Sequence, residues 1–241
     1  MTAPTSSFSG FALEPFPEVR PGDNLADVII GVLDRSEVEL EDGDVLVVAS
    51  KAVSIAEMRY VELAGVSSGP EAMELAARTG KPAGLVQLIL DASSGYFLAT
   101  PTGPIIARHT LGLQLTSAGV DRAGSAGAWL LPVDPDASAR ALRDALTAHT
   151  GAGLAVIVVD SDGRADRRGA TVVSIGAAGI RPLRVTEYDG KRQEETFTDL
   201  VAAAGGIILG QRGRGAPVAV LRGLSYEAGD EGVAAMLHNR P

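Results

Sequence analysis

The chain contains no cysteine, and only 4 % of its 241 residues are aromatic. Without cysteine, disulfide bonds, thiolate zinc sites and a cysteine nucleophile are all excluded. Apolar residues still make up 46 % of the chain, so the core must be built from Ala, Val, Leu and Ile. A chain of this length buries about 70 % of its unfolded surface, which is enough to fold without cross-links.

Long apolar runs and a leader sequence are also missing. No run approaches the roughly 20 residues that span a bilayer, and the start MTAPTSSFSGF lacks the basic and apolar regions of a signal peptide. We therefore expect a cytoplasmic protein that does not enter a membrane. The net charge is −9 and no basic stripe with interleaved aromatics occurs, so we expect no nucleic-acid partner.

The common phosphate-binding and nucleophile motifs are absent too. The chain has no GxxxxGK[ST] loop, no GxGxxG fingerprint and no GxSxG elbow. The three histidines, His109, His149 and His238, do not lie at metal-ligand spacing from one another. An acidic chain can still bind a phosphorylated ligand, because a divalent cation reverses the local charge where carboxylates converge. Any nucleotide would then bind through another device.

Hydrophobic periodicity and end signals predict the secondary structure. Helices are expected over residues 24–35, 70–78, 82–92, 134–151 and, in short form, 198–204. Strands are expected over residues 45–49, 96–99, 104–108, 154–159, 207–209 and 218–221, and residues 171–180 form a further apolar segment. Because no steady βαβ rhythm appears, we predict an α+β fold with mixed sheets. We expect one domain over residues 1–241, in which 225–241 form a polar C-terminal tail.

A dense polar cluster follows the apolar run LAVIVV, which is expected to end as a strand before Asp160. Asp160 and Ser161 come first, and Asp121 lies in a separate small, Gly-rich loop, AGVDRAGSAG. Ligands and metals often bind at strand ends, and two carboxylates beside a hydroxyl suit Mg²⁺ or Mn²⁺. The alternative is that Asp160 and Asp162 merely form a turn after the strand.

Two further groups of cationic residues lie beside predicted strands. Ser50 and Lys51 follow the strand VLVVA and would reach phosphate oxygens from its end; the alternative is a solvated lysine. Arg164, Arg167 and Arg168 follow the polar cluster. These arginines either bind phosphate or carboxylate, or pair with the neighbouring aspartates.

An ordered set of segments resembles the coenzyme F-420:gamma-glutamyl ligases, in particular the N-terminal ligase domain of the actinobacterial two-domain enzyme. The segments span nearly the whole chain: FPEVRPGDNL (16–25), DGDVLVVASKAVS (42–54), LGLQLTSAGVDRAG (111–124), LLPVDPDASARALR (130–143), AVIVVDSDGRADRRG (155–169), IGAAGIRPLR (175–184) and PVAVLRGL (217–224). No single motif decides the resemblance; the order of the set does.

The resemblance implies a non-phosphate-loop α+β fold, an intertwined homodimer, GTP as co-substrate and two divalent metals. In that family GTP phosphorylates the terminal carboxylate of the coenzyme F-420 precursor, and the amine of L-glutamate attacks the acyl phosphate to form an amide. Metals would stabilise charge on the transferring phosphoryl group, and positioning would supply much of the remaining rate enhancement.

The resemblance also assigns roles to individual residues. Asp121 and Asp160 match aspartates that bind the first metal and carry catalysis, and Ser161 stands where a threonine binds the second metal. Ser50 matches a serine that contacts the nucleotide. Phe16, Pro17, Glu18 and Val19 match a segment that touches the nucleotide.

Four positions depart from the family pattern. Ile55 replaces a lysine, Gly124 an asparagine that contacts nucleotide, and Asp166 a tryptophan, and an acidic residue is replaced near Gly205 and Gly206. A charge-assisted hydrogen bond is worth about 1.5–3 kcal/mol, so two lost donors would weaken GTP binding by several orders of magnitude. Two alternatives to the ligase therefore stand: a non-catalytic homologue that binds a ligand or partner, and a ligase with a different acid or amino acid.

Overall fold

The computed structural model describes residues 5–210 and 216–238. Within these ranges the chain forms six α-helices and thirteen β-strands, arranged as one five-stranded sheet and three smaller sheets. Helices and sheets are segregated along much of the chain, and one of the sheets mixes parallel with antiparallel pairs. The predicted α+β class with mixed sheets is therefore confirmed.

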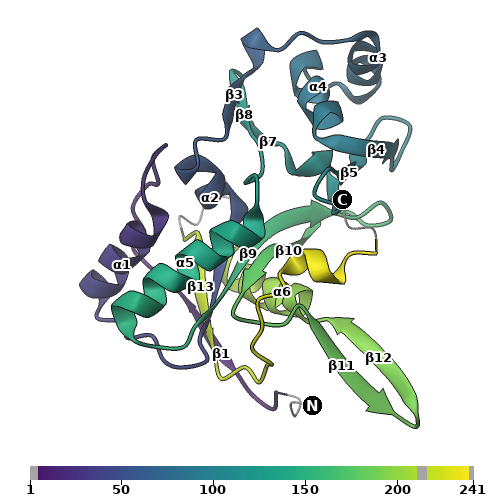
Figure 1. The fold of residues 1–241 in the computed structure, drawn as a ribbon. Helices are drawn as coiled ribbons and strands as arrows, with labels where there is room; N and C mark the ends of the chain where they lie inside the picture. The colour runs from purple at the N-terminus through teal and green to yellow at the C-terminus, as the bar shows by residue number, and fades with distance from the viewer. Residues whose placement is uncertain (1–4, 211–215, 239–241) are drawn as a thin grey trace.

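The five-stranded sheet forms the centre of the molecule (Figure 1). Its strands, in spatial order, are β1 (Ser9–Ala12), β13 (Val218–Arg222), β2 (Val45–Ala49), β9 (Ala155–Gly163) and β10 (Ala170–Ala178). Only β2 and β9 pair in parallel; the other neighbours are antiparallel. Consecutive residues of β2 and β9 are buried, which requires cover on both faces of the sheet.

Four helices pack on or beside this sheet: α1 (Leu25–Ser36), α2 (Ser50–Ala56), α5 (Pro135–Thr150) and α6 (Phe197–Leu209). The predicted end signals operate as expected. Asn24 accepts a hydrogen bond from the Ala26 amide at 3.1 Å, and Asp134 accepts one from the Ala137 amide at 2.8 Å. Gly151 ends α5 in the left-handed conformation. Local chemistry therefore fixes the bounds of α1 and α5.

Helix α6 approaches the sheet closely because it carries two adjacent glycines. A Cβ atom at Gly205 would lie 2.7 Å from a methyl group of Val47, and one at Gly206 would lie 2.5 Å from a methyl group of Val172. The strand predicted over residues 207–209 is wrong, since these residues form the last turn of α6. The β-branched side chains of Ile207 and Ile208 favour a strand, but the helix continues because its glycine face packs on β2 and β10.

The polar cluster after Val159 is also not a strand end. Strand β9 continues through Asp160 to Gly163, and Asp160, Ser161 and Asp162 pair with Val173, Val172 and Thr171 of β10. The predicted strand end at Asp160 is therefore wrong. The hydrogen bonds of β10 extend the strand beyond its apolar part, and local composition does not reveal such a partner.

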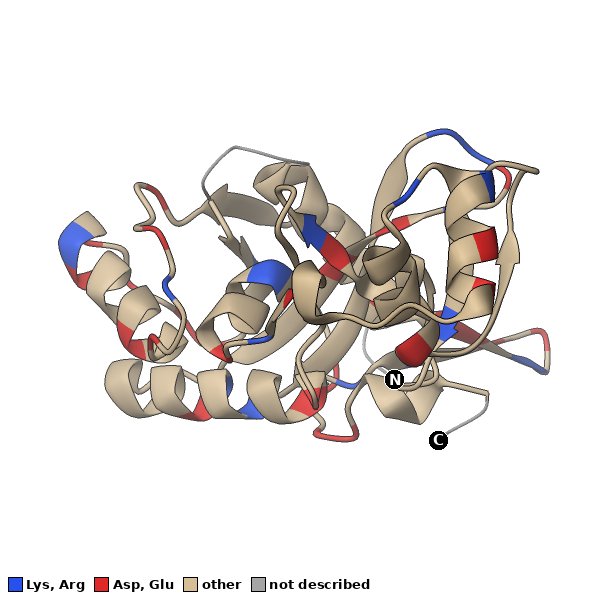
Figure 2. Ribbon diagram, turned by 90° about the horizontal axis from the view of Figure 1, so that it is seen from above, with Lys and Arg blue, Asp and Glu red and all other residues tan. Residues whose placement is uncertain are grey.

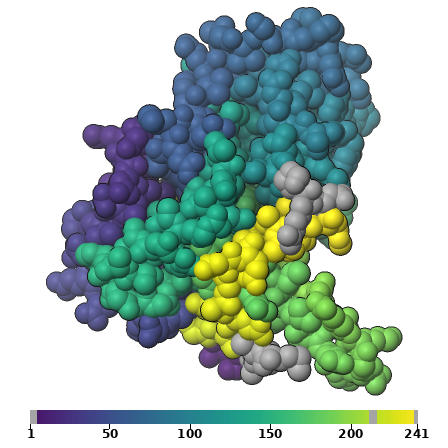
Figure 3. Space-filling model, viewed as in Figure 1, coloured from purple at the N-terminus to yellow at the C-terminus, as the bar shows by residue number. Residues whose placement is uncertain are grey.

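Residues 60–129 form a second lobe, which lies above the main sheet in the view of Figure 1 and at the top of the molecule in Figure 3. Its elements are β3 (Tyr60–Glu62), η1 (Leu63–Gly65), α3 (Pro70–Thr79), α4 (Ala83–Asp91), β4 (Ser93–Leu98), β5 (Ile105–His109), β6 (Gln114–Thr116), η2 (Ser117–Gly119), β7 (Asp121–Ala123) and β8 (Gly127–Trp129). A separate cluster of buried side chains, including Leu75, Val86, Ile89 and Ile105, forms its core. We call residues 60–129 the second lobe and the remainder the first lobe.

A two-stranded hairpin of β11 (Leu183–Tyr188) and β12 (Lys191–Thr196) projects from the first lobe (Figure 1). Every residue of β12 is exposed and no residue of β11 is fully buried, so burial gives the hairpin little sequence signal. At its base, the Arg184 guanidinium lies 4.6 Å above the Phe197 ring. This contact links the hairpin to the start of α6.

Residues 225–238, where a polar tail is expected, pack back on the first lobe. The short helix η3 (Val233–Met236) contains Val233, which is buried. Asp136 accepts hydrogen bonds from the amides of Ala177 and Val233, each at 2.8 Å. One carboxylate at the start of α5 therefore holds both β10 and the C-terminal segment.

The charged residues show no segregation in the view of Figure 2, where acidic and basic segments are interspersed along the helices and loops. No helix in the described parts of the chain is long and apolar enough to cross a membrane.

Candidate functional site

The parallel pairing of β2 and β9 brings Ser50 beside Asp160. Ala49, the last residue of β2, pairs with Val159 of β9, so Ser50, which follows β2, lies beside Asp160, the next residue of β9. The Ser50 hydroxyl donates a hydrogen bond of 2.8 Å to Asp160 Oδ1 across 110 residues of sequence. Ser50 is buried and opens helix α2.

Asp160 is half-buried. The pKa of Asp160 is raised to about 6, mainly by burial, and the nearby carboxylates of Asp121 and Asp162 act in the same direction. Hydrogen bonds from the Ser50 hydroxyl and the Ser161 amide act in the opposite direction. A cation near this carboxylate would offset the cost of its burial.

Asp121 lies in a different environment, at the start of β7 in the second lobe. It is 55 % exposed and forms a salt bridge of 2.8 Å with Lys51 Nζ, which is 50 % exposed. Lys51 follows Ser50 in α2. One short segment of the first lobe therefore reaches both aspartates, Asp160 through the hydroxyl and Asp121 through the ammonium.

Asp162 serves a separate purpose. Its Oδ1 accepts hydrogen bonds from the Thr116 amide at 2.7 Å and from the Thr116 hydroxyl at 3.2 Å. The Gly163 amide in turn donates to the Thr116 hydroxyl at 2.8 Å. These bonds tie β6 of the second lobe to the end of β9. Asp162 is thus neither a turn former nor a lining residue of the cavity described next.

A cavity of about 1240 Å³ lies between the two lobes. From the first lobe it is lined by Ser50, Lys51, Asp160 and Ser161, and from the second lobe by Asp121. Five of the residues singled out in the sequence therefore meet at one cavity. They come from β2–α2, β7 and β9, which are far apart in the chain.

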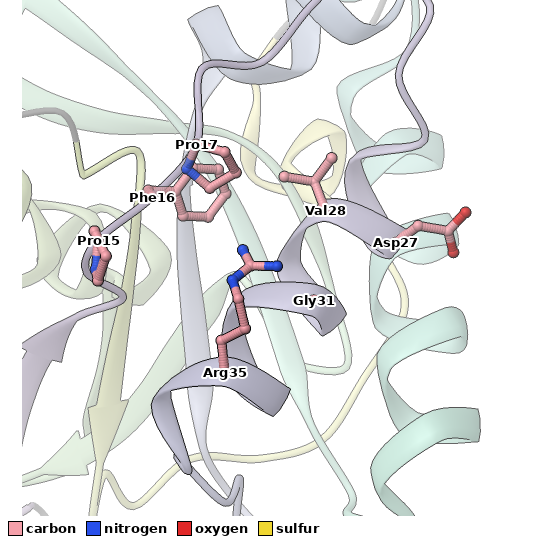
Figure 4. Close-up of a pocket in the computed structure, with 7 residues that line it drawn as sticks. All are labelled: Pro15, Phe16, Pro17, Asp27, Val28, Gly31 and Arg35. Atoms are coloured by element: carbon pink, nitrogen blue, oxygen red, sulfur yellow. The ribbon is translucent and has the colours of Figure 1, made fainter.

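The N-terminal segment lies elsewhere. Phe16 and Pro17 line a second cavity of about 540 Å³ together with Val28, Gly31 and Arg35 of α1 (Figure 4). In this view the Arg35 side chain points toward Phe16 and Pro17, and the Asp27 side chain points away from them. Glu18 is exposed, and Val19 packs against the main core. The structure does not bring residues 16–19 to the carboxylates.

The arginines after β9 are exposed and do not line the large cavity. Arg164 lies near enough to Asp162 to lower the pKa of that carboxyl, against the larger effect of burial. Arg167 forms a salt bridge of 3.8 Å with Asp166. Arg164 and Arg167 therefore lie near aspartates of their own segment, as expected if these arginines pair with the neighbouring aspartates rather than bind a ligand.

Sequence reasoning missed one wall of the large cavity. The connection between α3 and α4 contributes Thr79, Gly80, Lys81 and Pro82. The motif Gly-Lys-Pro between two predicted helices was the available signal, but by itself it indicates only a helix end and a helix start. Lys81 is partly buried.

The positions that depart from the family pattern fall in different places. Gly124 lines the large cavity, has φ of 61°, and accepts a hydrogen bond from Arg122 Nε at 2.7 Å. Ile55 lies in α2 and does not line this cavity. Gly206 packs against Val172, the β10 partner of Ser161. Because residue 206 is a glycine, it places no side chain near Ser161.

Divalent metal ions fit part of this arrangement. Asp121 and Asp160 supply hard oxygen ligands, and Mg²⁺ commonly takes one or two carboxylates and completes its shell with water and phosphate. Among the described residues, no group of three or more Asp, Glu or His side chains is placed to hold a metal. The protein therefore offers a carboxylate pair with adjacent hydroxyls rather than a complete cage.

The fold and cavity define a class: an α+β protein without a phosphate loop, in which carboxylates line a cavity beside a mixed sheet. The family model of F420-0:Gamma-glutamyl ligase matches residues 15–223, so the chain belongs to this ligase family. It is 36 % identical to the coenzyme F420:L-glutamate ligase of Methanothermobacter thermautotrophicus over 239 residues, which cover 95 % of this chain and 94 % of that protein. The corresponding protein of Archaeoglobus fulgidus is 37 % identical over 224 residues, 89 % of this chain and 87 % of that one.

Proposed function

We propose that the protein is a GTP- and divalent-metal-dependent ligase that joins L-glutamate to the terminal carboxylate of the coenzyme F-420 precursor. The single observation that carries this proposal is the meeting of Ser50, Lys51, Asp121 and Asp160 at one cavity, in a chain of the matching family. The names of the relatives supply the acid and the amino acid.

The reaction has two steps. The terminal carboxylate of the precursor attacks the γ-phosphorus of GTP, the bond between the β,γ-bridging oxygen and the γ-phosphorus breaks, and GDP leaves. The amine of L-glutamate then attacks the acyl carbon, an amide bond forms, and inorganic phosphate leaves as the amine loses a proton. Most of the catalysis in such phosphoryl transfers is positioning and charge stabilisation.

The residues of the cavity divide this work. Asp121 and Asp160, with the Ser161 hydroxyl, would hold Mg²⁺ or Mn²⁺, which when bound neutralises charge on the transferring phosphoryl group. Ser50 fixes the Asp160 carboxylate through its hydrogen bond. The Lys51 ammonium forms a salt bridge of 2.8 Å with the Asp121 carboxylate. A metal ion bound to Asp121 would replace Lys51 as the partner of this carboxylate and leave the ammonium free to bind a phosphate oxygen.

The first test is calorimetric titration of GTP into the purified protein, with Mn²⁺ and then with excess chelator. We expect metal-dependent binding in the micromolar range and glutamylated product by mass spectrometry. Asp160→Asn and Asp121→Asn should each abolish turnover while the fold persists, and Asp144→Asn, on the exposed face of α5, is the matched control. Turnover by the wild type in excess chelator would contradict the proposal.

A second candidate is a non-catalytic homologue that binds a ligand or a partner. Gly124 favours it, since this cavity position carries no side chain; Ile55 and Asp166 are further departures. Detection of glutamylated product under any metal and nucleotide condition would exclude this candidate. No GTP binding by a folded protein would favour it. Restoration of binding by Ile55→Lys with Gly124→Asn would then identify the lost contacts.

We further propose that the protein forms a homodimer through the hairpin and α6. Leu200 and Ile207 lie seven residues apart on one side of α6 and are 51 % and 81 % exposed, and Tyr188 at the hairpin tip is 77 % exposed. Ile207→Glu should convert a dimer to a monomer in sedimentation experiments. Met73→Glu, at a 53 % exposed residue of the second lobe, is the matched control. A wild-type monomer would contradict the proposal.

A further inference from the structure

The large cavity contains one lysine for which the proposed reaction has no role yet. Lys81 lies between Gly80, which ends α3 in the left-handed conformation, and Pro82, which precedes α4. Pro82 restricts the backbone of Lys81, and one residue on each side joins Lys81 to α3 and α4, so its backbone position follows from these two helices. It lines the same cavity as Asp121 and Asp160.

Lys81 differs from the other two lysines of the chain. Lys51 forms a salt bridge with Asp121, and Lys191 lies exposed on the hairpin. Lys81 is partly buried, and it makes no salt bridge within residues 5–210 and 216–238. A lysine that lines a cavity without an acidic partner can donate its three N–H groups to the oxygens of an anionic ligand.

We propose that Lys81 binds a carboxylate of the amino-acid substrate, L-glutamate. This inference rests on the proposed function. The phosphoryl group is handled by the carboxylate pair and Lys51, on segments separate from the α3–α4 connection. The terminal carboxylate of the acid reacts with this phosphoryl group, so it needs no separate cation. L-Glutamate reacts through its amine and keeps two free carboxylates, which need a cation elsewhere in the cavity.

The neighbours of Lys81 suit this ligand. Pro82 and Leu85 line the cavity beside it and offer apolar contact to the methylene groups of glutamate. The Thr79 hydroxyl is already used, since it donates to the Leu75 carbonyl at 2.8 Å. Arg122, the other cation of this wall, donates from Nε to the Gly124 carbonyl. Lys81 is the lysine that the second lobe contributes to this cavity, and its ammonium forms no salt bridge with any described residue.

The test measures three quantities for wild type, Lys81→Met, Lys81→Gln, Lys81→Arg and Lys191→Met. These are the KM for L-glutamate, the KM for the acid, and the affinity for GTP with Mn²⁺. We expect the Met and Gln variants to raise the KM for L-glutamate by about 10- to 100-fold, with both other quantities within about twofold of wild type. Lys81→Arg should recover part of the affinity, and Lys191→Met, the same change on the hairpin, should match wild type.

Each result decides between this inference and the proposed function. A wild type that forms product, with an unchanged KM for L-glutamate in both Lys81 variants, overturns the inference alone. A change only in the GTP affinity or in the KM for the acid also overturns it. If the wild type forms no product, the proposed function fails, and calorimetry with L-glutamate decides the inference. Binding that Lys81→Gln weakens supports it, and absent or unchanged binding overturns it.

Discussion

The two walls of the large cavity use aspartate in opposite ways. Asp160 extends from a fully covered sheet, is half-buried, and is held by the Ser50 hydroxyl. Asp121 begins a three-residue strand of the second lobe, is 55 % exposed, and pairs with a lysine from the other wall. One wall is a rigid continuation of the core, and the other is a solvated edge. The same side chain therefore carries a cost of burial in the first wall and almost none in the second.

The largest difference between Asp160 and Asp121 should appear in how each affects the pH dependence of the free energy of unfolding. Because the pKa of Asp160 is about 6 in the folded protein, against 3.8 for a solvated aspartate, the folded state holds more protons than the unfolded state between these values. The free energy of unfolding therefore falls as pH rises from about 4 to above 6. Asp160→Asn should raise it at pH 7.5 by roughly 1–3 kcal/mol and change it little below pH 4.

Denaturant unfolding at pH 4 and pH 7.5 measures this effect. Asp121→Asn is the matched control, and it should change the free energy of unfolding by less than about 0.5 kcal/mol at either pH, since it removes only an exposed ion pair. Equal effects of the two substitutions at pH 7.5 would erase the distinction between the walls.

The second prediction concerns the packing behind each wall. Gly205→Ala places a Cβ atom against Val47, which is fully buried in β2. Despite a gain in helix propensity of about 1 kcal/mol, overpacking should lower the free energy of unfolding by about 1–2 kcal/mol net. Gly95→Ala in β4 of the second lobe meets open space and should have no cost. Thermal unfolding of both variants would test this, and a stabilised Gly205→Ala would contradict the close packing of α6.

The third prediction concerns the residue that connects the walls. Lys51→Met should change the free energy of unfolding by less than about 1 kcal/mol, since both partners of the ion pair are half exposed. It should weaken GTP binding in the presence of Mn²⁺ by about tenfold, because a phosphate oxygen loses a charged donor. Calorimetry measures the affinity, with Lys191→Met as the control. An unchanged GTP affinity would exclude Lys51 as a phosphate-binding residue and leave only its salt bridge with Asp121.

The smallest effect on stability is expected at Gly124. Its φ is 61° and a Cβ atom added there would meet no other atom within 4 Å, and asparagine adopts this conformation more readily than most residues. Gly124→Asn should change the free energy of unfolding by about 0.5 kcal/mol or less and raise GTP affinity several-fold by adding a donor. Gly190→Asn, at a similar φ of 69° on the hairpin, is the control. Equal GTP affinities would exclude this residue as a nucleotide contact.

Much of the first lobe follows from local sequence. The caps Asn24, Asp134 and Gly151 mark helix ends through short-range hydrogen bonds, and the run at residues 45–49 is apolar enough to be recognised as a buried strand. The predictions at Asp160 and at residues 207–209 are wrong because both depend on distant partners. Strand β10 prolongs β9, and the contact of Gly205 with Val47 holds the last turn of α6.

The site was predictable to a different degree on each wall. Ser50 and Asp160 each follow an apolar run, and the parallel pairing of these runs places the two residues side by side. Asp121 is indicated by its small, Gly-rich loop and by the family resemblance, but no local pattern predicts that it pairs with Lys51 of the first lobe. Lys81 was missed because a single lysine between two helices has no local feature that distinguishes it from a solvated one.

The parallel pairing of β2 with β9 has a consequence for how this chain can change during evolution. Side chains alternate between the faces of a strand, so a one-residue insertion within β9 would either turn Asp160 away from Ser50 or exchange the two faces on which the preceding apolar residues pack. The pairing of β9 with β2 therefore positions the apolar residues of the core and Asp160 of the site at once. Insertions and deletions can accumulate in the hairpin, where no residue of β12 is buried, but each change of length in β9 alters folding and chemistry together.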